Sequence, residues 1–403
     1  MKQKKLLLLG GLQYLLPVIA EAHKLGAYVI TADYLPDNIA HKYSDEYVNV
    51  SIIDKEAVLK VAREKEIDGI MSFAVDPGVV TAAYVAEQMG LPFQCSYKSA
   101  SILQDKSLFR QFLADNGFNC PHARGYTNID EALSDIDYFT WPVIVKPVDS
   151  AGSKGVTRVD TPNDLKKAIE FALLSSISKR FIIEDFLVLE GYQSSADIFI
   201  IDGDLVYPTY SDQFFDKDAA NPYTPAIEIW PSSMQQRYQE YLTRELQRLF
   251  ILLGMKSGIY NVECRVSNNG KAYIMEVSPR GGGNRIAELQ DMATGQSLIK
   301  NEVLKALGMP LDDIVTPVYN GVWCNYILHS RKAGILESIE IDEIFKAKYI
   351  RSIGFTKKNG DEVEVFMGAN QSLGTLFLHF ETREELNKAL SNTDNWLKIK
   401  LKK

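Results

Sequence analysis

Two glutamates in one stretch of the chain have the residue type and spacing for shared chemistry. Glu263 and Glu276 lie on either side of Asn269-Gly270, the pair most favoured in a two-residue type I′ turn between antiparallel strands. Residues at equal distances from such a turn face each other, so the sequence predicts that Glu263 lies opposite Glu276. Facing carboxylates repel unless a cation lies between them, a proton is shared or solvent screens them.

The same register predicts one chemical face and one buried face of the hairpin. Asn261 lies opposite Ser278 on the polar face. The alternating residues of the other face are apolar: Val262, Cys264, Val266, Tyr273, Met275 and Val277. A site with two carboxylates suits Mg²⁺, which keeps its remaining positions for water and nucleotide phosphates, and Mn²⁺ is an alternative ion. The competing interpretation is an exposed hairpin with two solvated glutamates.

Groups that bind anions follow the second strand directly. Ser278-Pro279-Arg280 leads into Gly281–Arg285, so backbone amides and two guanidinium groups arrive where an anion would meet the metal. The fork of Arg280 matches a carboxylate and a phosphoryl group alike, which makes Arg280 a candidate catalytic residue. The alternative is an arginine that only balances the nearby glutamates.

This stretch resembles the ATP-grasp superfamily of carboxylate–amine ligases. That family has a metal-binding Glu on one strand and Glu-x-Asn-Pro-Arg on the next, and here EVSPR runs from Glu276 to Arg280 after Glu263. The resemblance implies that Glu263, Glu276 and Ser278 bind the metal. Ser278 replaces the usual Asn, as a small residue does in L-amino-acid ligases and some purine-biosynthetic members, so its role as a ligand stays open.

Two lysines and a loop of small residues precede the hairpin in the family's order. Trp141–Pro147 is predicted to be a short strand that carries Lys146, and the flexible Asp149–Val156 follows, without the G-x-x-x-x-G-K-[ST] of a Walker loop. By resemblance the loop is a mobile lid. A lone surface lysine is the alternative for Lys106. The expected nucleotide contacts here are Lys106, Lys146, Ser150, Gly152, Ser153 and Gly155.

Further nucleotide contacts are expected after the next strand. Phe181–Leu187 resembles the hinge whose backbone recognises adenine, and its expected contacts are Glu184, Asp185, Phe186 and Leu187. The family usually continues with Gly-x-Glu, whose Glu holds the ribose hydroxyls. Here Gln193 takes that place after Gly191, and either Gln193 or Glu190 is expected to bind ribose.

Alternating strands and helices before residue 97 predict a parallel sheet. The strands are expected at 6–9, 27–32 and 69–74, and the helices at 12–25, 54–66 and 77–89. Gly10, Gly11 and Asp33 raise the alternative of a dinucleotide site, but the required G-x-G-x-x-G is missing. A simple βα turn is favoured, and by resemblance such a sheet helps to hold the carboxylate substrate.

Beyond residue 97 the order of elements changes. The predicted elements are a helix at 99–116, strands at 194–201 and 205–210, a helix at 232–254, strands near 321–329, 335–341, 363–368 and 374–381, and a helix at 384–390. We therefore predict a multidomain α/β and α+β fold. It has a Rossmann-like N-terminal domain (1–96), an ATP-grasp domain (97–308, with a lid at about 120–187) and a C-terminal α+β domain (309–403).

Composition limits the other functional classes. With 403 residues and 46% hydrophobic side chains the chain can bury several cores, while its net charge of −8 gives no general attraction to nucleic acid. Four scattered cysteines and five histidines without metal spacing predict reduced thiols and no zinc site. No apolar run reaches about 18 residues, and Gly10-Gly11 interrupts a start like that of a signal peptide, so we expect a cytoplasmic protein without membrane contact.

Together these residues and the resemblance to ATP-grasp ligases imply an ADP-forming enzyme. ATP would phosphorylate a small-molecule carboxylate, and an amine would displace phosphate from the acyl phosphate. Only one set of motifs is present, whereas the large subunit of carbamoyl-phosphate synthetase carries two. A homodimer is one option for the assembly. The alternatives are a nucleotide-binding regulator with reduced catalysis, which Ser278 and Gln193 favour, and a nicotinamide-dependent oxidoreductase, which the missing glycine fingerprint disfavours.

Overall fold

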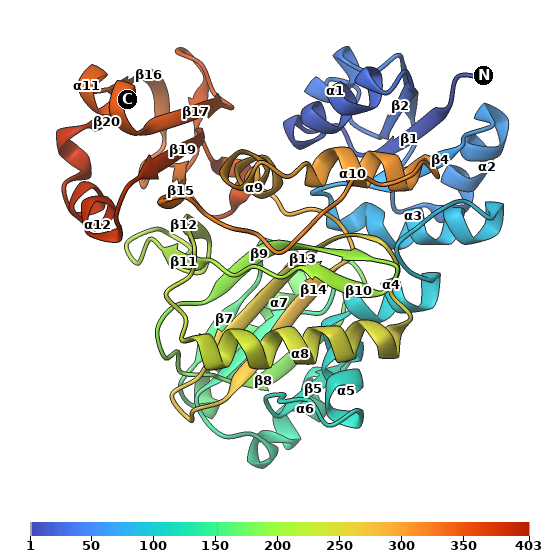
Figure 1. Cartoon of the computed structure of the whole chain (residues 1–403). Helices are drawn as coiled ribbons and strands as arrows, with labels where there is room; N and C mark the ends of the chain where they lie inside the picture. The colour runs from blue at the N-terminus through green and yellow to red at the C-terminus, as the bar shows by residue number, and fades with distance from the viewer. Residues whose placement is uncertain (1, 151, 403) are drawn as a thin grey trace.

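The computed structural model of the chain describes residues 2–150 and 152–402. Its N-terminal part (blue) and its C-terminal part (red) stand side by side over a central region drawn in green and yellow (Figure 1). The N-terminal sheet is parallel, and the other four sheets are antiparallel. The predicted multidomain α/β and α+β fold class is confirmed.

The N-terminal sheet has the strand order β3-β2-β1-β4. Its elements are β1 (Lys5–Leu9), α1 (Leu16–Lys24), β2 (Tyr28–Asp33), β3 (Glu46–Asn49), α2 (Lys55–Lys65), β4 (Gly69–Ser72) and α3 (Asp76–Met89). The sequence does not predict β3, because this short edge strand has no fully buried residue and no apolar alternation. The helix expected at 12–25 begins only at Leu16, after a 3-10 turn at Gln13–Leu15.

The single helix expected at 99–116 is two helices, α4 (Tyr97–Gln104) and α5 (Lys106–Asp115). Asp105 separates them in an extended conformation, and its carboxylate accepts hydrogen bonds from the N–H groups of Ser107 and Leu108. A side chain that caps a helix in this way starts a new helix inside a continuous amphipathic pattern. Lys106 is therefore the first residue of α5.

Two four-stranded sheets form the centre, in the orders β5-β8-β6-β7 and β10-β9-β13-β14. Helix α7 packs on the first sheet and α8 on the second. Their elements are β5 (Ala123–Tyr126), α6 (Ile129–Ser134), β6 (Val143–Pro147), β7 (Thr157–Val159), α7 (Leu165–Ser175), β8 (Phe181–Asp185), β9 (Ser194–Ile201), β10 (Asp204–Tyr207), α8 (Gln236–Leu253), β13 (Gly258–Val266) and β14 (Ala272–Ser278).

The turn between β13 and β14 is not the predicted type I′ turn. Its loop has three residues and is closed by a hydrogen bond from the N–H of Ser267 to the carbonyl of Lys271 (2.9 Å). Gly270 has a φ of 76°, whereas Asn269 is outside the positive-φ region that both central residues of a type I′ turn require. The prediction is wrong because a three-residue loop needs only one residue with positive φ, and Gly270 alone supplies it.

A bulge in β14 nevertheless restores the predicted pairing of the two glutamates. Beside the loop Cys264 faces Ile274, and a continuation of that register would place Met275 opposite Glu263. The register instead shifts by one residue, so that Glu276 faces Glu263. Met275 is therefore the extra residue of a β-bulge, a feature that re-aims side chains next to many active sites.

The loop and the bulge together decide which residues of the hairpin are buried in the main hydrophobic cluster. That cluster contains Val262, Cys264 and Val266 of β13 and Ala272, Ile274 and Val277 of β14. Tyr273 and Met275, which are predicted for this face, lie outside it, and Tyr273 faces Arg265 instead. The prediction fails for these two residues because the longer loop shifts the alternation of β14 by one position, up to the bulge.

Two further sheets form the C-terminal part, in the orders β11-β12-β15-β19-β17 and β18-β16-β20. The elements are β11 (Asp212–Phe215), β12 (Pro225–Trp230), β15 (Val322–Leu328), β16 (Gly334–Ile341), α11 (Glu343–Tyr349), β17 (Ile350–Phe355), β18 (Glu362–Val363), β19 (Gly374–Phe380), α12 (Arg383–Ser391) and β20 (Leu397–Lys402). The sequence does not predict β11, β12, β17 or β20. Because β11 and β12 come from the middle of the chain, the predicted boundary at 308 crosses the larger of these sheets.

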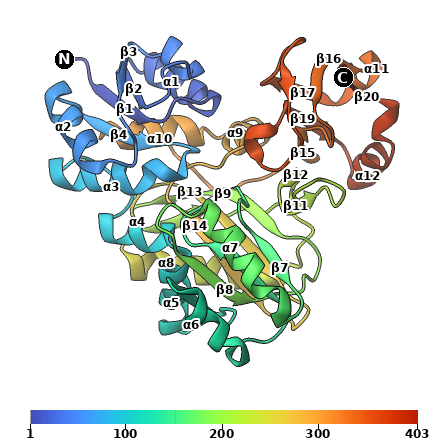
Figure 2. The ribbon, with the colours of Figure 1, turned by 180° about the vertical axis from the view of Figure 1, so that it is seen from behind.

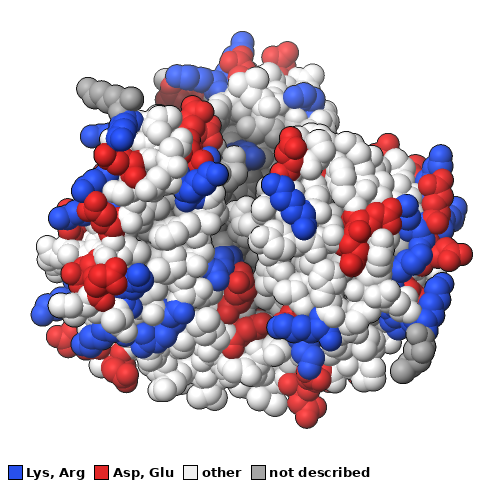
Figure 3. Space-filling model, turned by 90° about the horizontal axis from the view of Figure 1, so that it is seen from above, with Lys and Arg blue, Asp and Glu red and all other residues white. Residues whose placement is uncertain are grey.

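Helices α9 (Ile286–Thr294) and α10 (Leu298–Ala306) join the three parts, as the view from behind shows (Figure 2). Ile299 and Val303 of α10 share a hydrophobic cluster with β1 and β9, and Leu289 of α9 shares one with β12, β15 and β19. Viewed from above, the surface is hollowed near its centre (Figure 3). In the part of the chain that the structure describes, no helix has both the length and the hydropathy of a membrane span.

Candidate active site

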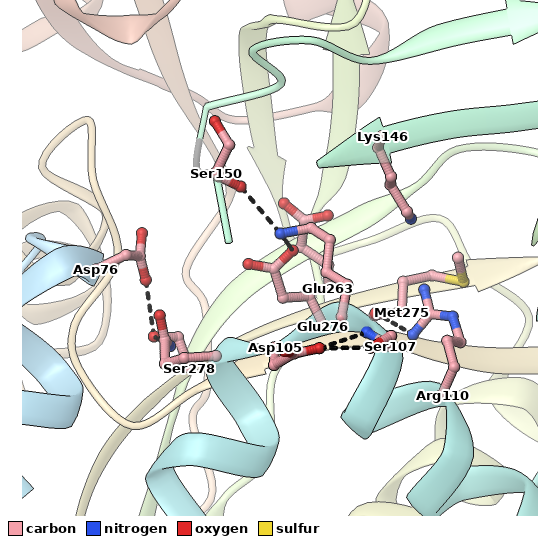
Figure 4. Close-up of polar contacts among 12 residues, drawn as sticks. Asp76, Asp105, Ser107, Arg110, Lys146, Ser150, Glu263, Met275, Glu276 and Ser278 are labelled. Carbon is pink, nitrogen blue, oxygen red and sulfur yellow. Dashed lines mark hydrogen bonds and ion pairs between the residues drawn. The ribbon is translucent and has the colours of Figure 1, made fainter. Parts of the chain in front are cut away.

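The facing glutamates meet a lysine from α5. Glu263 and Glu276 extend close together from β13 and β14 (Figure 4). The Nζ atom of Lys106 lies 3.6 Å from Oε2 of Glu276 and donates a hydrogen bond to the carbonyl of Ser150 (3.0 Å). The structure thus brings together four predicted site residues from α5, the loop after β6 and the central hairpin.

The carboxylate pair needs a compensating positive charge. Burial and the negative charge of Glu276 raise the pKa of Glu263 to about 7. A divalent ion bound by both side chains would relieve this repulsion, so the donors fit Mg²⁺, which proteins often hold through one or two carboxylates plus phosphates. Among residues 2–150 and 152–402, no three His, Cys, Asp or Glu side chains form a larger metal-ligand cluster.

Lys146 belongs to a buried chain of ion pairs. Its ammonium group pairs with one carboxylate oxygen of Glu184, and Nε of Arg110 pairs with the other (2.8 Å). Burial lowers the pKa of Lys146 to about 8. Burial alone would raise the pKa of Glu184, but the charges of Arg110 and Lys146 outweigh it and lower that pKa to about 2. The side chain of Glu184 therefore orients Lys146 in this structure.

The loop predicted to be a lid spans the site from Lys106 to the segment between β11 and β12. Its Gly152 and Gly155 have φ angles of 69° and 72°, which glycine adopts without strain. The hydroxyl of Ser153 donates to the carbonyl of Tyr223 (3.0 Å), and the carbonyl of Ser153 accepts from the side chain of Asn221 (3.2 Å). These few polar contacts hold the far end of the loop.

The segment predicted to contact adenine follows the ion-paired Glu184. The carboxylate of Asp185 accepts a hydrogen bond from the N–H of Thr140 (2.9 Å), and the N–H of Phe186 donates to the carbonyl of Pro142 (3.0 Å). Leu187 lies beyond the end of β8. These bonds fix the segment against the residues before β6, and its contact with a base stays a prediction.

Gln193, a candidate for ribose binding, lies beside Glu263 of the facing glutamate pair. Its amide nitrogen donates to Glu263 (3.1 Å) and to Gln213 (2.8 Å), and its oxygen accepts from Arg265 (2.6 Å). Gln193 is buried, whereas the other candidate, Glu190, is exposed. The structure groups Gln193 with Glu263, and ribose binding by either residue stays a prediction.

Asp76 of α3 occupies the fork of Arg280. Nε and Nη2 of Arg280 donate to the two carboxylate oxygens of Asp76 (2.8 and 2.6 Å), and Nη1 donates to the carbonyl of Gly281 (2.9 Å). The hydroxyl of Ser278 donates to the same carboxylate (2.9 Å) and accepts from Gln104 (2.8 Å). Both predicted residues therefore have Asp76 as a partner, and a substrate anion at Arg280 would have to replace it.

A row of buried polar residues, which the sequence does not predict, continues from Gln193. Gln213, Glu228 and Asn325 face one another across β11, β12 and β15. One carboxylate oxygen of Glu228 accepts from Gln213 (3.1 Å) and the other from Asn325 (3.3 Å). Burial raises the pKa of Glu228 to about 8, and the charges of Asp197 and Glu263 add to this effect.

Two acceptors at the end of this row lack a donor. The side-chain oxygens of Asn284 and Asn325 are buried and have no hydrogen-bond partner among the described residues. The amide nitrogen of Asn325 donates to the backbone carbonyl of Asn284 (2.7 Å), which holds the two residues together. Asn284 has a φ of 51°, an uncommon conformation outside glycine. A bound group with several N–H donors would satisfy these oxygens.

The sequence contains only partial signals for the residues that it does not predict. Arg110 follows Lys106 by four positions, so the two share a helix face, and a charged residue on a buried face indicates an ion pair. Glu228 interrupts an apolar run at 226–230. Asp76 stands directly before a proline at a helix start, where an acidic residue is ordinary. None of these signals indicates which partner each residue meets.

Comparisons with known proteins match this part of the chain. A profile of the ATP-grasp domain matches residues 139–288. The carbamoyl phosphate synthase large chain of Thermotoga neapolitana is 22% identical over 296 residues, which cover 73% of this chain and 26% of that protein. A formate-dependent phosphoribosylglycinamide formyltransferase of Syntrophotalea carbinolica is 23% identical over 316 residues, 77% of either protein. The chain spans about a quarter of the length of the synthase large chains that it matches.

Solved structures share the fold over the whole length. The L-amino acid ligase of Bacillus licheniformis superposes with a TM-score of 0.83 at 21% identity, and the match covers 100% of both chains. The phosphoribosylglycinamide synthetase of Anaerococcus prevotii superposes with a TM-score of 0.76 at 20% identity, again over 100% of both chains. The similarity therefore includes the N-terminal and C-terminal parts as well as residues 139–288.

Proposed function

This chain contains an ATP-grasp domain, and from that premise we propose that it is an ATP- and Mg²⁺-dependent carboxylate–amine ligase. An oxygen of a small carboxylic acid bonds to the γ-phosphorus of ATP while the bond to the bridging oxygen breaks and ADP leaves. An amine then attacks the acyl carbon, its proton is lost, and phosphate departs. The observation that carries this proposal is that Glu263 and Glu276 face each other beside Lys106, which also bonds the start of the loop after β6 at Ser150.

Phosphoryl transfer depends on positioning and charge neutralisation, and no side-chain nucleophile is needed. Glu263 and Glu276, with Ser278 as a third candidate, would hold the divalent ion, which neutralises phosphate charge when bound. Lys106 and Lys146 place ammonium groups on the phosphates. The amides of Ser150 and of residues 152–155 cover them, and Glu184–Leu187 with Gln193 contact the nucleoside.

Arg280 is proposed to meet the anionic substrate by exchange of partners. Its fork already binds the carboxylate of Asp76 through two parallel hydrogen bonds. A substrate carboxylate or a transferred phosphoryl group has the same forked geometry, so it can take the place of Asp76 without a change in the donors. Asp76 would in that case keep its hydrogen bond with Ser278.

The buried row at Glu228 supports an amine as the second substrate. An ammonium group has three donors, and the unpaired oxygens of Asn284 and Asn325 together with the carboxyl of Glu228 offer acceptors. A cation at this place would also lower the pKa of Glu228, so that its carboxylate could take the proton that the ammonium group must lose before its nitrogen can attack. Gln213 and Gln193 link this row to Glu263.

The test is a screen for ADP release with amino acids and other small carboxylic acids, with hydroxylamine as a surrogate amine. We expect a hydroxamate only when ATP, Mg²⁺ and a suitable acid are present, because hydroxylamine intercepts an acyl phosphate. Glu276→Gln is the control, since it keeps the shape of the side chain but removes a metal-binding charge, and its activity should fall by at least about 100-fold. Tight ATP binding without hydroxamate across a broad panel would favour a nucleotide-binding regulator instead.

A further inference from the structure

Arg110 contacts both halves of the proposed phosphate site. It projects from α5 one turn after Lys106 and is 3% exposed. Its Nε atom donates to Glu184 (2.8 Å), the carboxylate that orients Lys146. Its Nη1 atom donates to the backbone carbonyl of Met275 (2.8 Å), as Figure 4 shows. One guanidinium group thus links β14 to β8, the strand that leads into the predicted adenine hinge.

Met275 is the bulged residue that decides which side chain faces Glu263. A three-residue loop without a bulge would place Met275 opposite Glu263. Because Met275 is the extra residue of the bulge, Glu276 takes that position instead. A bulge leaves the backbone groups of the extra residue outside the regular ladder, so its carbonyl needs another donor. Arg110 supplies that donor from outside the sheet.

We propose that Arg110 is a positioning residue for the metal site: it fixes the bulge at Met275, and through the bulge it holds Glu276 opposite Glu263. The inference rests on the proposed function, because it assigns to Glu276 a role in Mg²⁺ binding. The polar partners of the Arg110 side chain in the structure are Glu184 and the carbonyl of Met275, so its role is to position other residues. Its second bond, to Glu184, ties the register of the metal site to the orientation of Lys146.

Arginine is needed here for its geometry as well as for its charge. A guanidinium group directs two N–H donors to two separated acceptors in a fixed plane, which a lysine ammonium group cannot reproduce from one point. Arg110→Lys keeps a positive charge near Glu184 and gives up the bond to Met275. Residues that orient metal ligands typically change metal affinity by about 10- to 100-fold when they are replaced.

The experiment measures ATP binding to the full-length protein by calorimetry, with EDTA and over a Mg²⁺ titration. For Arg110→Lys we expect the Mg²⁺ concentration that gives half-maximal strengthening of ATP binding to rise by about 10- to 100-fold. Affinity for metal-free ATP should change little. Arg248→Lys is the matched control, since Arg248 also bonds a carboxylate and a backbone carbonyl but lies on α8, away from the glutamates.

Combining Arg110→Lys with Glu276→Gln separates positioning from general destabilisation. If Arg110 acts through Glu276, the double variant should have the same Mg²⁺ dependence as Glu276→Gln alone. The proposal would be overturned if Arg110→Lys raised the required Mg²⁺ concentration by the same factor in the Glu276→Gln background as it does alone. An unchanged Mg²⁺ dependence in Arg110→Lys would also overturn it. Failure of the unaltered protein to bind ATP, or binding that ignores Mg²⁺, would instead count against the proposed function.

Discussion

Carboxyl groups around the site differ in what balances their charge. Glu184 pairs with two cationic side chains, and Asp76 pairs with the guanidinium group of Arg280. Among the described residues, only the neutral amides of Gln213 and Asn325 donate hydrogen bonds to Glu228. Its carboxyl is therefore mostly protonated at neutral pH, whereas the other two are ionised.

This difference predicts how Glu228→Gln changes stability with pH. The pKa of Glu228 is raised to about 8 in the folded protein, so between its ordinary value and pH 8 the folded state keeps a proton that the unfolded state loses. Its contribution to stability is complete below its ordinary pKa and is lost as the pH rises through this window, on the order of 1 kcal/mol per pH unit. The contribution of Gln to stability does not depend on pH. The unfolding temperature of Glu228→Gln, relative to that of the unaltered protein, should therefore rise from pH 5 to pH 8.

Thermal unfolding in matched buffers measures this gain. Glu384→Gln is the control, because Glu384 is exposed and a substitution there should shift the midpoint equally at every pH. A constant difference between Glu228→Gln and the unaltered protein over this pH range would mean that Glu228 is already ionised at pH 5. That result would remove the protonated carboxyl from the proposed amine site.

At the scale of elements, the sequence predicts the pairing of the glutamates for an incomplete reason. The Asn269-Gly270 pair identifies the hairpin correctly, but Gly270 adopts its conformation within a longer loop, and the bulge at Met275 cancels the resulting shift. A bulge depends on contacts from other parts of the fold, such as the bond from Arg110, and no local pattern reveals it. The same limit explains β12, which pairs with β15 about a hundred positions later, and β11, which pairs with β12.

The break between α4 and α5 differs from the bulge, because the signal for its helix cap is present in the sequence. Asp105 has the residue type of a helix cap, and it splits the helix predicted at 99–116 into α4 and α5. The hydrophobic periodicity continues across the break, so periodicity alone joins the two helices. The split matters for the site, since it makes Lys106 the first residue of a helix and places Arg110 one turn further along.

The loop after β6 is the element whose motion the structure makes testable. In the described part of this loop, hydrogen bonds of Ser153 with Tyr223 and Asn221 hold its far end. We expect ATP with Mg²⁺ to slow hydrogen exchange at the amides of residues 152–156 by at least about tenfold, because phosphates accept hydrogen bonds from these groups. Exchange at the turn 202–204, which is distant in the fold, is the internal control and should stay the same.

Exchange at 152–156 that is equally fast with and without the nucleotide would remove the assignment as a lid. Asn221→Ala refines the test, since it removes one of the contacts at the far end of the loop. In this variant the loop should exchange faster without nucleotide and still be protected when ATP and Mg²⁺ are bound.

At the scale of the whole molecule, both apolar and ionic contacts join the N-terminal part to the centre. One apolar contact is the cluster that α10 shares with β1 and β9, and another packs Val79 and Ala83 of α3 with β13 and β14. An ionic contact is the bidentate pair of Asp76 and Arg280, whose side chains are 17% and 8% exposed. Since Arg280 lies two residues beyond the end of β14, this pair connects the end of the strand that carries Glu276 to helix α3.

Asp76→Asn should therefore weaken the whole fold as well as the site. The variant leaves the guanidinium group of Arg280 buried without its counter-charge, and loss of one partner of a buried pair typically costs about 3–5 kcal/mol. Asp135→Asn is the matched control, because Asp135 pairs with Arg124 nearer the surface, and a loss below about 1 kcal/mol is expected there. Because the apolar cluster remains, we expect one cooperative unfolding transition whose midpoint falls by several degrees, measured by scanning calorimetry. An unfolding temperature of Asp76→Asn no lower than that of Asp135→Asn would show that Asp76 does not stabilise the buried guanidinium group of Arg280. The proposed exchange of Asp76 for a substrate anion would then lose its basis.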